Sequence, residues 1–337
     1  MGALGPPWPA AVGVSGGSDS LALMFLLRDW AKSRRLPPPI VLCVDHGLRS
    51  ESRAEARQVV LWARKAGLDS RVLTFLKPPP HSDIEAACRV ARYRLMGDWA
   101  KRKRLSAVCV AHTQDDQAET FLLRLARGSG VDGLAAMRAI APYPDHDFPE
   151  LSLVRPLLGF ERQELRGYLD AAGQPWLEDP MNGDPRFARA RIRSAWPQLE
   201  HLGLTRNRLA EAAAHLGRAR AALDAVSGAV LLRACRPYQD GVVVDPVALT
   251  GAPRELGLRA LAGILMAVAG KPYRPRFERL QGLFDSISAG RLGAARTLHG
   301  CRIAPAPKKC AVFGERTLLV LPEKARQSTG KGRGGPQ

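Results

Sequence analysis

The distribution of apolar positions predicts an α/β fold for the first half of the chain. Short continuous apolar runs, typical of buried parallel strands, alternate with longer segments of helical periodicity. Strands are expected at residues 11–14, 40–44, 71–76, 107–111 and 151–158. Helices are expected at 21–27, at 50–66, from a capping-box sequence at Ser82 to 101–104, from an N-cap at Thr113 to Arg127, and at 161–172. This alternation predicts a Rossmann-like parallel sheet.

The second half of the chain has a different pattern, in which helices dominate. One or two helices are expected over 199–235, and further helices at 256–270 and 277–289. A short strand is expected at 241–245, and 298–303 and 310–313 resemble the strands of a hairpin. Trp196-Pro197 marks the expected domain boundary. We therefore expect an α/β catalytic domain at 1–195, a mainly helical smaller domain at 196–322, and a disordered basic tail at 323–337.

The loop after the first strand has the composition of an anion cradle. It reads Ser15-Gly16-Gly17-Ser18-Asp19-Ser20 and runs directly into a helix. Glycines let a backbone approach a phosphate, and the first N–H groups of a helix have no intrahelical partner. Asp19 fits against phosphate if Mg²⁺, an amine or a ribose hydroxyl lies between them. The loop is neither a Walker A nor a G-x-G-x-x-G sequence; the alternative is an ordinary turn.

Two other strands also end in polar side chains. Asp45 and His46 follow the second strand, and His112 follows the fourth. In an open α/β sheet ligands bind outside the carboxyl ends of the strands, so these residues are expected near the 15–20 loop. Asp115, Asp116 and Glu119 begin the next helix. These carboxylates either complement the helix dipole or form a site for a cation, Mg²⁺ or a substrate ammonium; we favour the site.

Several arginines are placed to reach a phosphate. Arg92 and Arg94 lie at opposite edges of an apolar helical stripe, and Arg127-Gly128 forms a flexible basic turn. After the polar loop 178–185, Arg186, Arg189 and Arg193 have the spacing of one helix face. This face is either an exposed salt-bridged surface, an RNA-backbone contact or an active-site wall.

The charge and the cysteine content of the chain limit the classes of partner and cofactor that it could bind. The 337 residues contain 50 Lys and Arg against 32 Asp and Glu, a formal net charge of +18. Such an excess favours a polyanion, most often nucleic acid, over a mere compositional bias. The six cysteines form no C-x-x-C pair, which favours reduced core thiols over a zinc or iron–sulfur site. No apolar run reaches the ~20 residues of a membrane span. With no secretory signal visible, we expect a cytoplasmic location.

Seven motifs in this order resemble those of tRNA(Ile)-lysidine synthases, which are PP-loop enzymes, or N-type ATP pyrophosphatases. The resemblance extends over residues 1–195, through the motifs at 15–20, 44–49, 91–95, 111–120, 125–130, 155–158 and 179–182. It implies a sheet of the adenine nucleotide alpha hydrolase type and a helical tRNA-binding extension. Thr113, Met181 and Ala190 depart from the family pattern, which leaves roles at those positions in doubt.

The resemblance implies an ATP-dependent ligase with Mg²⁺ as cofactor. Such an enzyme adenylates the wobble cytidine in the CAU anticodon of tRNA(Ile) and then attaches L-lysine, releasing pyrophosphate and AMP. Residues expected to bind ATP are Ser15, Gly16, Gly17, Ser18, Asp19, Ser20, Asp45 and His46. Expected catalytic residues are Asp19, Arg94, His112, Asp115, Asp116 and Glu119, with Asp19 and Asp115 as candidate Mg²⁺ ligands. Residues expected to bind the other substrates are Arg127, Gly128, Asp179, Asn182, Arg186, Arg189 and Arg193.

Three alternatives follow from the same residues. A PP-loop tRNA thiolase would need sulfur-handling cysteines, commonly as C-x-x-C. A synthetase of the GMP synthetase type would need a glutaminase domain or partner. A non-catalytic nucleotide- or RNA-binding relative would not need Asp19, Asp115 and Glu119. The sequence leaves open a homodimer.

Overall fold

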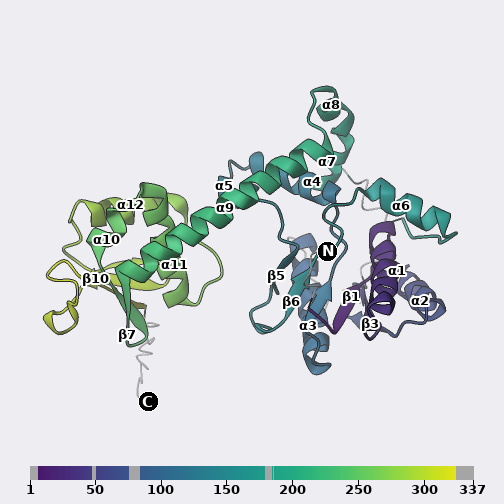
Figure 1. Ribbon diagram of the computed structural model, residues 1–337, viewed down its shortest axis with the longest axis horizontal. Helices are drawn as coiled ribbons and strands as arrows, with labels where there is room; N and C mark the ends of the chain where they lie inside the picture. Colours follow the sequence, from purple (N-terminus) through teal and green to yellow (C-terminus); the bar gives the residue numbers. More distant parts are fainter. Residues whose placement is uncertain (1–6, 48–50, 76–83, 179–183, 185, 324–337) are drawn as a thin grey trace, which may run out of the picture. The chain divides into compact units, whose positions relative to one another are not determined.

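The computed structural model describes residues 7–47, 51–75, 84–178, 184 and 186–323 (Figure 1). The chain forms two compact units, 1–218 and 219–337. The division falls within a long helix, α9 (Arg206–Ala234), and therefore later than the boundary expected at Trp196. Each unit has its own core.

The first unit is built on one six-stranded sheet with the order β3-β2-β1-β4-β6-β5. All neighbouring strands are parallel except β5 and β6. The strands are β1 (Ala10–Gly13), β2 (Ile40–Asp45), β3 (Ser70–Thr74), β4 (Ala107–Cys109), β5 (Ile140–Pro142) and β6 (Ser152–Val154). The expected parallel α/β sheet is therefore confirmed, with β5 as an additional antiparallel edge strand.

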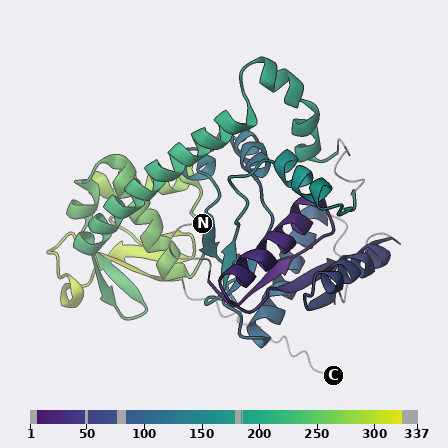
Figure 2. The ribbon, with the colours of Figure 1, turned by 45° about the vertical axis from the view of Figure 1, so that its right-hand side comes forward.

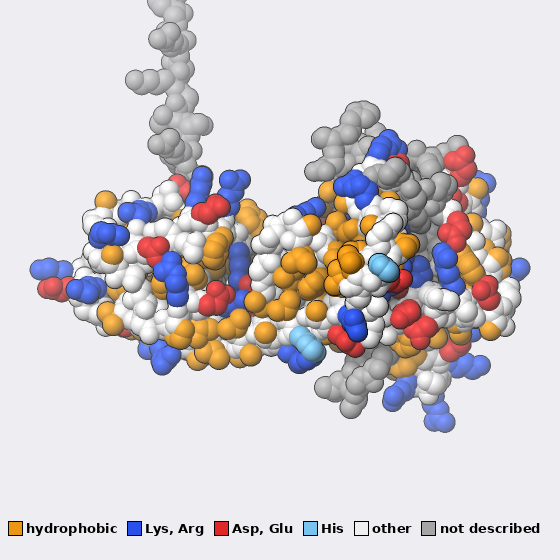
Figure 3. All heavy atoms as spheres, turned by 90° about the horizontal axis from the view of Figure 1, so that it is seen from above, with side chains coloured by type: hydrophobic (Ala, Val, Ile, Leu, Met, Phe, Trp, Pro, Cys, Tyr) orange, Lys and Arg blue, Asp and Glu red, His pale blue; other side chains and the backbone are white. Residues whose placement is uncertain are grey.

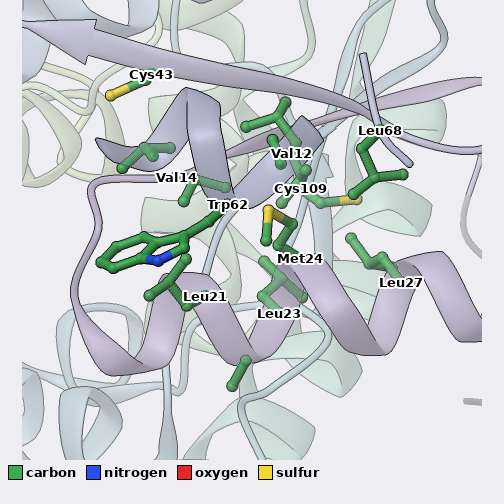
Figure 4. Close-up of a cluster of buried hydrophobic side chains, with 14 of the residues drawn as sticks. Val12, Val14, Leu21, Leu23, Met24, Leu27, Cys43, Trp62, Leu68 and Cys109 are labelled. Atoms are coloured by element: carbon green, nitrogen blue, oxygen red, sulfur yellow. The ribbon is translucent and has the colours of Figure 1, made fainter. Parts of the chain in front are cut away.

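Helices cover both faces of this sheet (Figures 1 and 2). The helices that follow the strands are α1 (Ser18–Ser33), α2 (Ser52–Lys65), α3 (Ile84–Arg102), α4 (Gln114–Leu125), α5 (Val131–Leu134) and α6 (Arg162–Ala171). Successive strand residues point to opposite faces. Val12 accordingly packs with α1, α2 and α6, whereas Ala11 packs with α3. Figure 4 shows Leu21, Met24 and Trp62 closing over the first of these faces.

The topology produces one switch point. The chain runs from β1 outward through β2 and β3, and then crosses to β4 on the other side of β1. The connections leaving β1 and β4 therefore diverge, and a crevice opens between their carboxyl ends. This is where ligands bind in open α/β sheets.

Three further helices complete the first unit: α7 (Ala188–Ser194), α8 (Trp196–His201) and the first half of α9. Trp196 is only 3% exposed and packs with Ala118 of α4 and Leu209 of α9. Its indole also lies under the guanidinium of Arg206, 4.5 Å from the ring centroid. Trp196 is thus a core residue and not part of a linker, which explains why the compact unit continues to Arg218.

The second unit combines helices with a five-stranded antiparallel sheet of order β7-β8-β11-β10-β9. The strands are β7 (Cys235–Tyr238), β8 (Gly241–Val244), β9 (Arg296–Leu298), β10 (Cys301–Pro305) and β11 (Leu318–Pro322). Three helices accompany them: α10 (Pro246–Thr250), α11 (Arg254–Ala269) and α12 (Phe277–Ser288). The expected helices are present, but the sheet is larger than one hairpin.

The prediction of a strand at 310–313 was wrong. Cys310 ends a 3₁₀ turn, η2 (Lys308–Cys310), and β10 pairs with β9 and β11 instead. Pro305 and Pro307 bracket the end of β10, where proline cannot donate to a ladder, so the chain turns there. All six cysteines are free thiols, as expected. No helix among the described residues is long and apolar enough to cross a membrane.

Candidate functional site

A cavity of about 740 Å³ opens at the switch point of the first unit. Its wall contains most of the 15–20 loop, together with Val44 near the end of β2, His46 after β2, and Ala111 and His112 after β4. The helices contribute charged residues, which are Glu55 of α2, Arg89 and Arg92 of α3, Asp116 of α4, Arg162 and Arg166 of α6, and Arg193 of α7. The carboxyl ends of β1, β2 and β4, which the sequence analysis expected to lie close together, therefore meet at this cavity.

The 15–20 loop is shaped by its own hydrogen bonds. Ser20 Oγ donates to the carbonyl of Gly17 (2.9 Å) and accepts the N–H of Ser15 (3.2 Å). Gly17 is the N-cap of α1, and no side chain caps this end. The N–H groups of the first turn thus face the cavity side without a side-chain competitor, which is the arrangement that binds anions.

Gly16 allows a second segment to cross the loop. Its φ is +95°, a left-handed conformation that suits glycine. Its carbonyl accepts the N–H of Leu177 (2.9 Å), and a Cβ added at Gly16 would lie 2.6 Å from Leu177 Cδ1. The segment that leads toward residue 178 is therefore fastened directly to the phosphate-binding loop.

Asp45 and His46 have different surroundings. Asp45 is buried and accepts hydrogen bonds from Gly47 N–H (2.9 Å) and Ser52 Oγ (2.7 Å). Burial opposes its ionisation, but these bonds hold its pKa below the usual range. Asp45 is not among the cavity-lining residues; it fixes the turn that presents His46. His46 Nε2 accepts from Arg92 Nη2 (3.0 Å), since a guanidinium can only donate.

Four carboxylates are paired with four arginines in a cluster of which Asp19, Asp116, Arg162 and Arg193 reach the cavity wall. We call Asp19, Asp115, Asp116 and Glu119 the acidic array. Arg193 Nε lies 2.7 Å from Glu119, Arg189 Nη1 3.2 Å from Asp116, and Arg206 Nε 3.1 Å from Asp115. Arg162 Nε lies 2.9 Å from Asp19 Oδ2. Each carboxylate therefore has a guanidinium partner, as buried charges require.

Arg162 links the array together. Its Nη2 lies 3.7 Å from Asp116 and its Nη1 3.8 Å from Glu119, while its backbone N–H donates to Asp115 Oδ2 (2.8 Å). One residue at the start of α6 thus contacts every member of the acidic array. Burial disfavours its charge, but the carboxylates more than compensate and raise the pKa of Arg162.

His112 and Asp116 interact electrostatically, and at neutral pH one is uncharged and the other is ionised. Burial lowers the pKa of His112 to about 4, helped by nearby arginines and opposed by Asp116. Burial alone would raise the pKa of Asp116, but the N–H of Thr113 and the charge of Arg162 lower it. Thr113 caps α4, and its N–H donates to Asp116 Oδ2 (2.9 Å). At neutral pH the pair is therefore a neutral imidazole beside a carboxylate.

The comparisons with known proteins match this geometry. Residues 8–199 match the model of the PP-loop domain family. The chain is 35% identical to a tRNA(Ile)-lysidine synthase of Wolbachia pipientis over 92% of its length and 70% of that protein. It is 41% identical to those of Ruegeria pomeroyi (95% of this chain, 75% of that protein) and Methylobacterium nodulans (82% of each).

The chain belongs to the tRNA(Ile)-lysidine synthase family. This is a ligase family built on a PP-loop ATP pyrophosphatase domain. Among solved structures, the chain matches the U34-tRNA thiolase NcsA of Methanococcus maripaludis with a TM-score of 0.49 and 17% identity, over 62% of this chain and 71% of that one. That likeness is too distant to carry an argument about function.

Not every residue that the family resemblance suggested lies in the site. Arg94 does not line the cavity; it pairs with Asp145 (3.2 Å) and Asp147. The arginines of α3 that line the cavity are Arg89 and Arg92. Helical geometry explains the difference, because residues two apart point to different sides of a helix. Arg127 and Gly128 are exposed beyond the end of α4. Arg186 is exposed and pairs with Asp184 (2.6 Å).

Asp179 and Asn182 lie outside the described residues. Arg189 and Arg193 do share a face of α7, as their spacing predicted, and that face contacts the acidic array.

The sequence interpretation missed Arg162, Arg89, Arg166 and Glu55. Arg162 follows no recognisable pattern: it is the first residue of an amphipathic helix, a position where charged residues are common. Only the contact of α6 with α1 brings it to the cavity. Glu55 and Arg89 lie on helices that the sequence predicted, but the pattern of apolar residues does not indicate which polar flank faces a ligand.

Mg²⁺ is normally held by one or two carboxylates together with phosphate oxygens of a substrate. Asp19 fits this role because it lines the cavity beside the 15–20 loop. Asp115 does not fit, since it is not on the cavity wall and its two oxygens accept from Arg206 and from the backbone of Arg162. Within the described part of the chain, no three His, Cys, Asp or Glu side chains could hold a metal by themselves. The residues thus fit an ion carried by a triphosphate.

Proposed function

We propose that this protein joins L-lysine to C2 of the wobble cytidine, position 34, in the CAU anticodon of tRNA(Ile). Family membership supports the activity, and the observation that carries it is one cavity lined both by the 15–20 loop and by Asp116 of the acidic array. The reaction needs a site for a triphosphate next to a site for an amine. Asp19 and Asp116 line one cavity at the switch point of the sheet, which supports assigning both sites to it.

In the first step, cytidine O2 attacks the α-phosphorus of ATP, and the bond to the β-phosphate breaks to release pyrophosphate. The first-turn N–H groups of α1 and the loop hydroxyls would hold the phosphates. Arg89 and Arg92 on the opposite wall would offset the charge that develops on the leaving group. Mg²⁺, held by Asp19 and the phosphates, supplies Lewis-acid stabilisation of that charge when it is bound.

In the second step, the ε-amine of lysine loses a proton and attacks C2, and the C–O bond to AMP breaks. Asp116 and Glu119 are the carboxylates that would orient the ammonium before it reacts. Glu119 is 3% exposed and not itself on the cavity wall, so its contact with the amine requires Arg193 or Arg162 to yield. His112, neutral at pH 7, would act through hydrogen bonding and not as a cation.

The RNA partner is supported by charge. The chain has a net charge of +18, and exposed Arg186 lies just before α7, which connects to the cavity through Arg189 and Arg193. We assign the second unit, with its helices and antiparallel sheet, to tRNA binding. We expect the reaction to take place in the cytoplasm, and a homodimer stays a prediction.

The deciding experiment uses ATP, radiolabelled lysine and tRNA(Ile) transcripts with C or U at position 34. Label is expected on the wobble-C transcript alone, with one AMP and one pyrophosphate formed per lysine. No label on that transcript would refute the lysidine assignment. Pyrophosphate release without label would instead indicate that adenylation occurs but that a group other than lysine displaces AMP.

The thiolase alternative can be judged from the one cysteine on the cavity wall, Cys43. Burial, together with the charges of Asp45 and Glu55, raises the pKa of its thiol to about 12. A thiol this weakly acidic is a poor nucleophile at neutral pH. Cys43→Ser should therefore retain lysine transfer, whereas a sulfur-transferring enzyme would lose its activity.

Glu119→Gln tests the amine site. The substitution keeps the shape but removes the charge that faces Arg193 and Arg162. We expect the KM for lysine to rise about tenfold or more, in line with the loss of a charged hydrogen-bond partner, with little change in the KM for ATP. An equal change in both constants would assign Glu119 a purely structural role.

A further inference from the structure

Arg162 places a permanent cation against Asp19. The two side chains are 22% and 18% exposed, so their contact is partly buried and less screened than a surface pair. Asp19 has two side-chain partners among the described residues, Arg162 at Oδ2 and Ser18 Oγ at Oδ1 (3.1 Å). The carboxylate that suits Mg²⁺ is therefore already neutralised by a guanidinium of the protein.

Arg162 also has other carboxylates within reach. Asp116 and Glu119 lie 3.7 and 3.8 Å from its two Nη atoms, beyond hydrogen-bond distance but close enough for strong attraction. If Asp19 turned to another cation, the guanidinium would still face two carboxylates. A buried charge that loses its partner is the usual obstacle to such a rearrangement. Here the obstacle is removed, because Arg162 would keep two carboxylates after Asp19 turned to another cation.

We propose that Arg162 is a positioning residue that holds Asp19 in the nucleotide-free enzyme and releases it when ATP binds together with Mg²⁺. The inference rests on the proposed nucleotide site. Arg162 keeps the 15–20 loop from presenting an unpaired carboxylate to the incoming triphosphate. It then remains on Asp116 and Glu119, so that occupancy of the ATP site is communicated to the carboxylates assigned to the amine.

This exchange has a signature that a structural role lacks. Without Mg²⁺, removal of Arg162 exposes the triphosphate to an unpaired Asp19, so a nucleotide should bind more weakly. With Mg²⁺, the ion no longer competes with a guanidinium for Asp19, so binding should be strengthened relative to the Mg²⁺-free state. Simple loss of packing would instead weaken binding by the same factor in both conditions.

The test is the Kd of α,β-methylene-ATP, which cannot be cleaved between the α- and β-phosphates, measured by calorimetry on the full chain. It is measured in excess chelator and again in saturating Mg²⁺, with no tRNA or lysine. We define the Kd ratio as the Kd in chelator divided by the Kd in Mg²⁺. This ratio should be about three- to fivefold larger in Arg162→Gln than in the wild type, the range expected for a partly exposed ion pair. Arg162→Lys, which keeps the charge on a different donor, should give an intermediate ratio.

The matched control is Arg166→Gln. Arg166 lies one turn later on α6 and lines the same cavity, but pairs with Glu178 (3.1 Å) and not with Asp19. This variant should keep the wild-type ratio even if both Kd values change. In an Asp19→Asn background, Arg162→Gln should have no further effect on the ratio, since the shared partner is gone.

An unchanged ratio in Arg162→Gln, or an equal change in Arg166→Gln, would overturn the proposal while leaving the nucleotide site intact. Absence of analogue binding by the wild type would overturn both. Thermal unfolding of each variant verifies that it is folded; if Arg162→Gln does not fold, the intermediate ratio expected of Arg162→Lys decides the question.

Discussion

At the scale of single residues, the site is a balanced arrangement of charges. Four carboxylates of the acidic array face Arg162, Arg189, Arg193 and Arg206 at 2.7–3.2 Å for their nearest pairs. If the proposed function holds, a substrate ammonium or Mg²⁺ would have to displace an arginine from its carboxylate in order to bind there. This makes the arginines as important to the order of binding as the carboxylates they neutralise.

Asp19→Ala should abolish ATP turnover without unfolding the protein. Removing this carboxylate takes away the one member of the acidic array beside the phosphate-binding loop, and kcat should fall on the order of 100-fold or more. Arg162 keeps Asp116 and Glu119 as partners, so the thermal midpoint should stay within ~2–4 °C of the wild type. The control is Asp29→Ala, on the same helix but paired at the surface with Arg28. Global unfolding of Asp19→Ala would give Asp19 a structural role.

His112 makes stability depend on pH. Its pKa is about 4 in the folded protein and near 6.5 when unfolded, so the unfolded chain takes up a proton first as the pH falls. The contribution of the neutral imidazole is complete above about pH 6.5 and is lost between pH 6.5 and 4. On the scale of 1.36 kcal/mol per pKa unit it amounts to on the order of 3 kcal/mol.

Thermal midpoints at pH 7 and pH 5 check this expectation. The drop between the two pH values should be smaller in His112→Gln than in the wild type. His215→Gln, an exposed substitution on α9, should show the wild-type drop. An identical drop in all three proteins would mean that other groups govern the acid sensitivity.

Residue chemistry could be predicted where it follows a strand end. Asp19, His46, His112 and Asp116 were expected to be near one another, because the carboxyl ends of parallel strands share one edge. Arg162 could not be predicted, since its place depends on how α6 packs on α1. Arg92 and Arg94 were both expected to reach a cleft, and only Arg92 lines the cavity, because residues two apart point to different sides of a helix.

At the scale of elements, the 15–20 loop and the segment at Leu177 act as one unit. Their backbones are hydrogen-bonded, and Leu177 packs where Gly16 has no side chain. Leu177 also lines the cavity, and the chain beyond it leads to the arginines of α7. The phosphate-binding loop and the proposed RNA-facing helix are thus connected through a short stretch of chain.

Gly16→Ala should weaken nucleotide binding and destabilise the first unit. A non-glycine residue at a φ of +95° is strained, at a cost of at least ~1–2 kcal/mol, and its Cβ would clash with Leu177. Gly17→Ala is the matched control, because Gly17 has a φ of −70° and the nearest neighbour of its Cβ would be Ser15 Oγ at 3.8 Å. Thermal unfolding and binding of α,β-methylene-ATP measure both effects. Equal behaviour of the two variants would contradict the role given to Gly16.

Element prediction succeeded for most continuous apolar runs, although the buried strand β11 was not predicted, and it failed where strands were short or partly exposed. The buried strands β1, β2 and β4 were expected within a few residues. β5 was missed because it is a three-residue edge strand, and β7 was missed because it is short and partly exposed. The 3₁₀ turn at Cys310 was mistaken for a strand, since local apolar composition does not reveal that the ladder partner of β10 begins at Leu318.

At the scale of the whole molecule, the excess of basic residues is the dominant property. Lys and Arg side chains are distributed among Asp and Glu over the face seen in Figure 3, and no single patch holds them all. The acidic array uses a different principle, because its four arginines are paired with carboxylates. Those pairs cancel and add nothing to the net charge of +18, which favours a polyanionic partner.

Binding of tRNA should consequently depend on salt far more steeply than binding of a nucleotide. Each phosphate neutralised by the protein contributes about −0.7 to −0.9 to the slope of log K against log salt, so several contacts give a slope of several units. Arg186→Ala should reduce the magnitude of that slope by about one, because this exposed side chain can leave Asp184 for a phosphate. Arg28→Ala is the matched control, an arginine also paired with a nearby aspartate but located on α1. A flat salt dependence would mean that the positive charge reflects composition alone and that tRNA is held by neutral contacts.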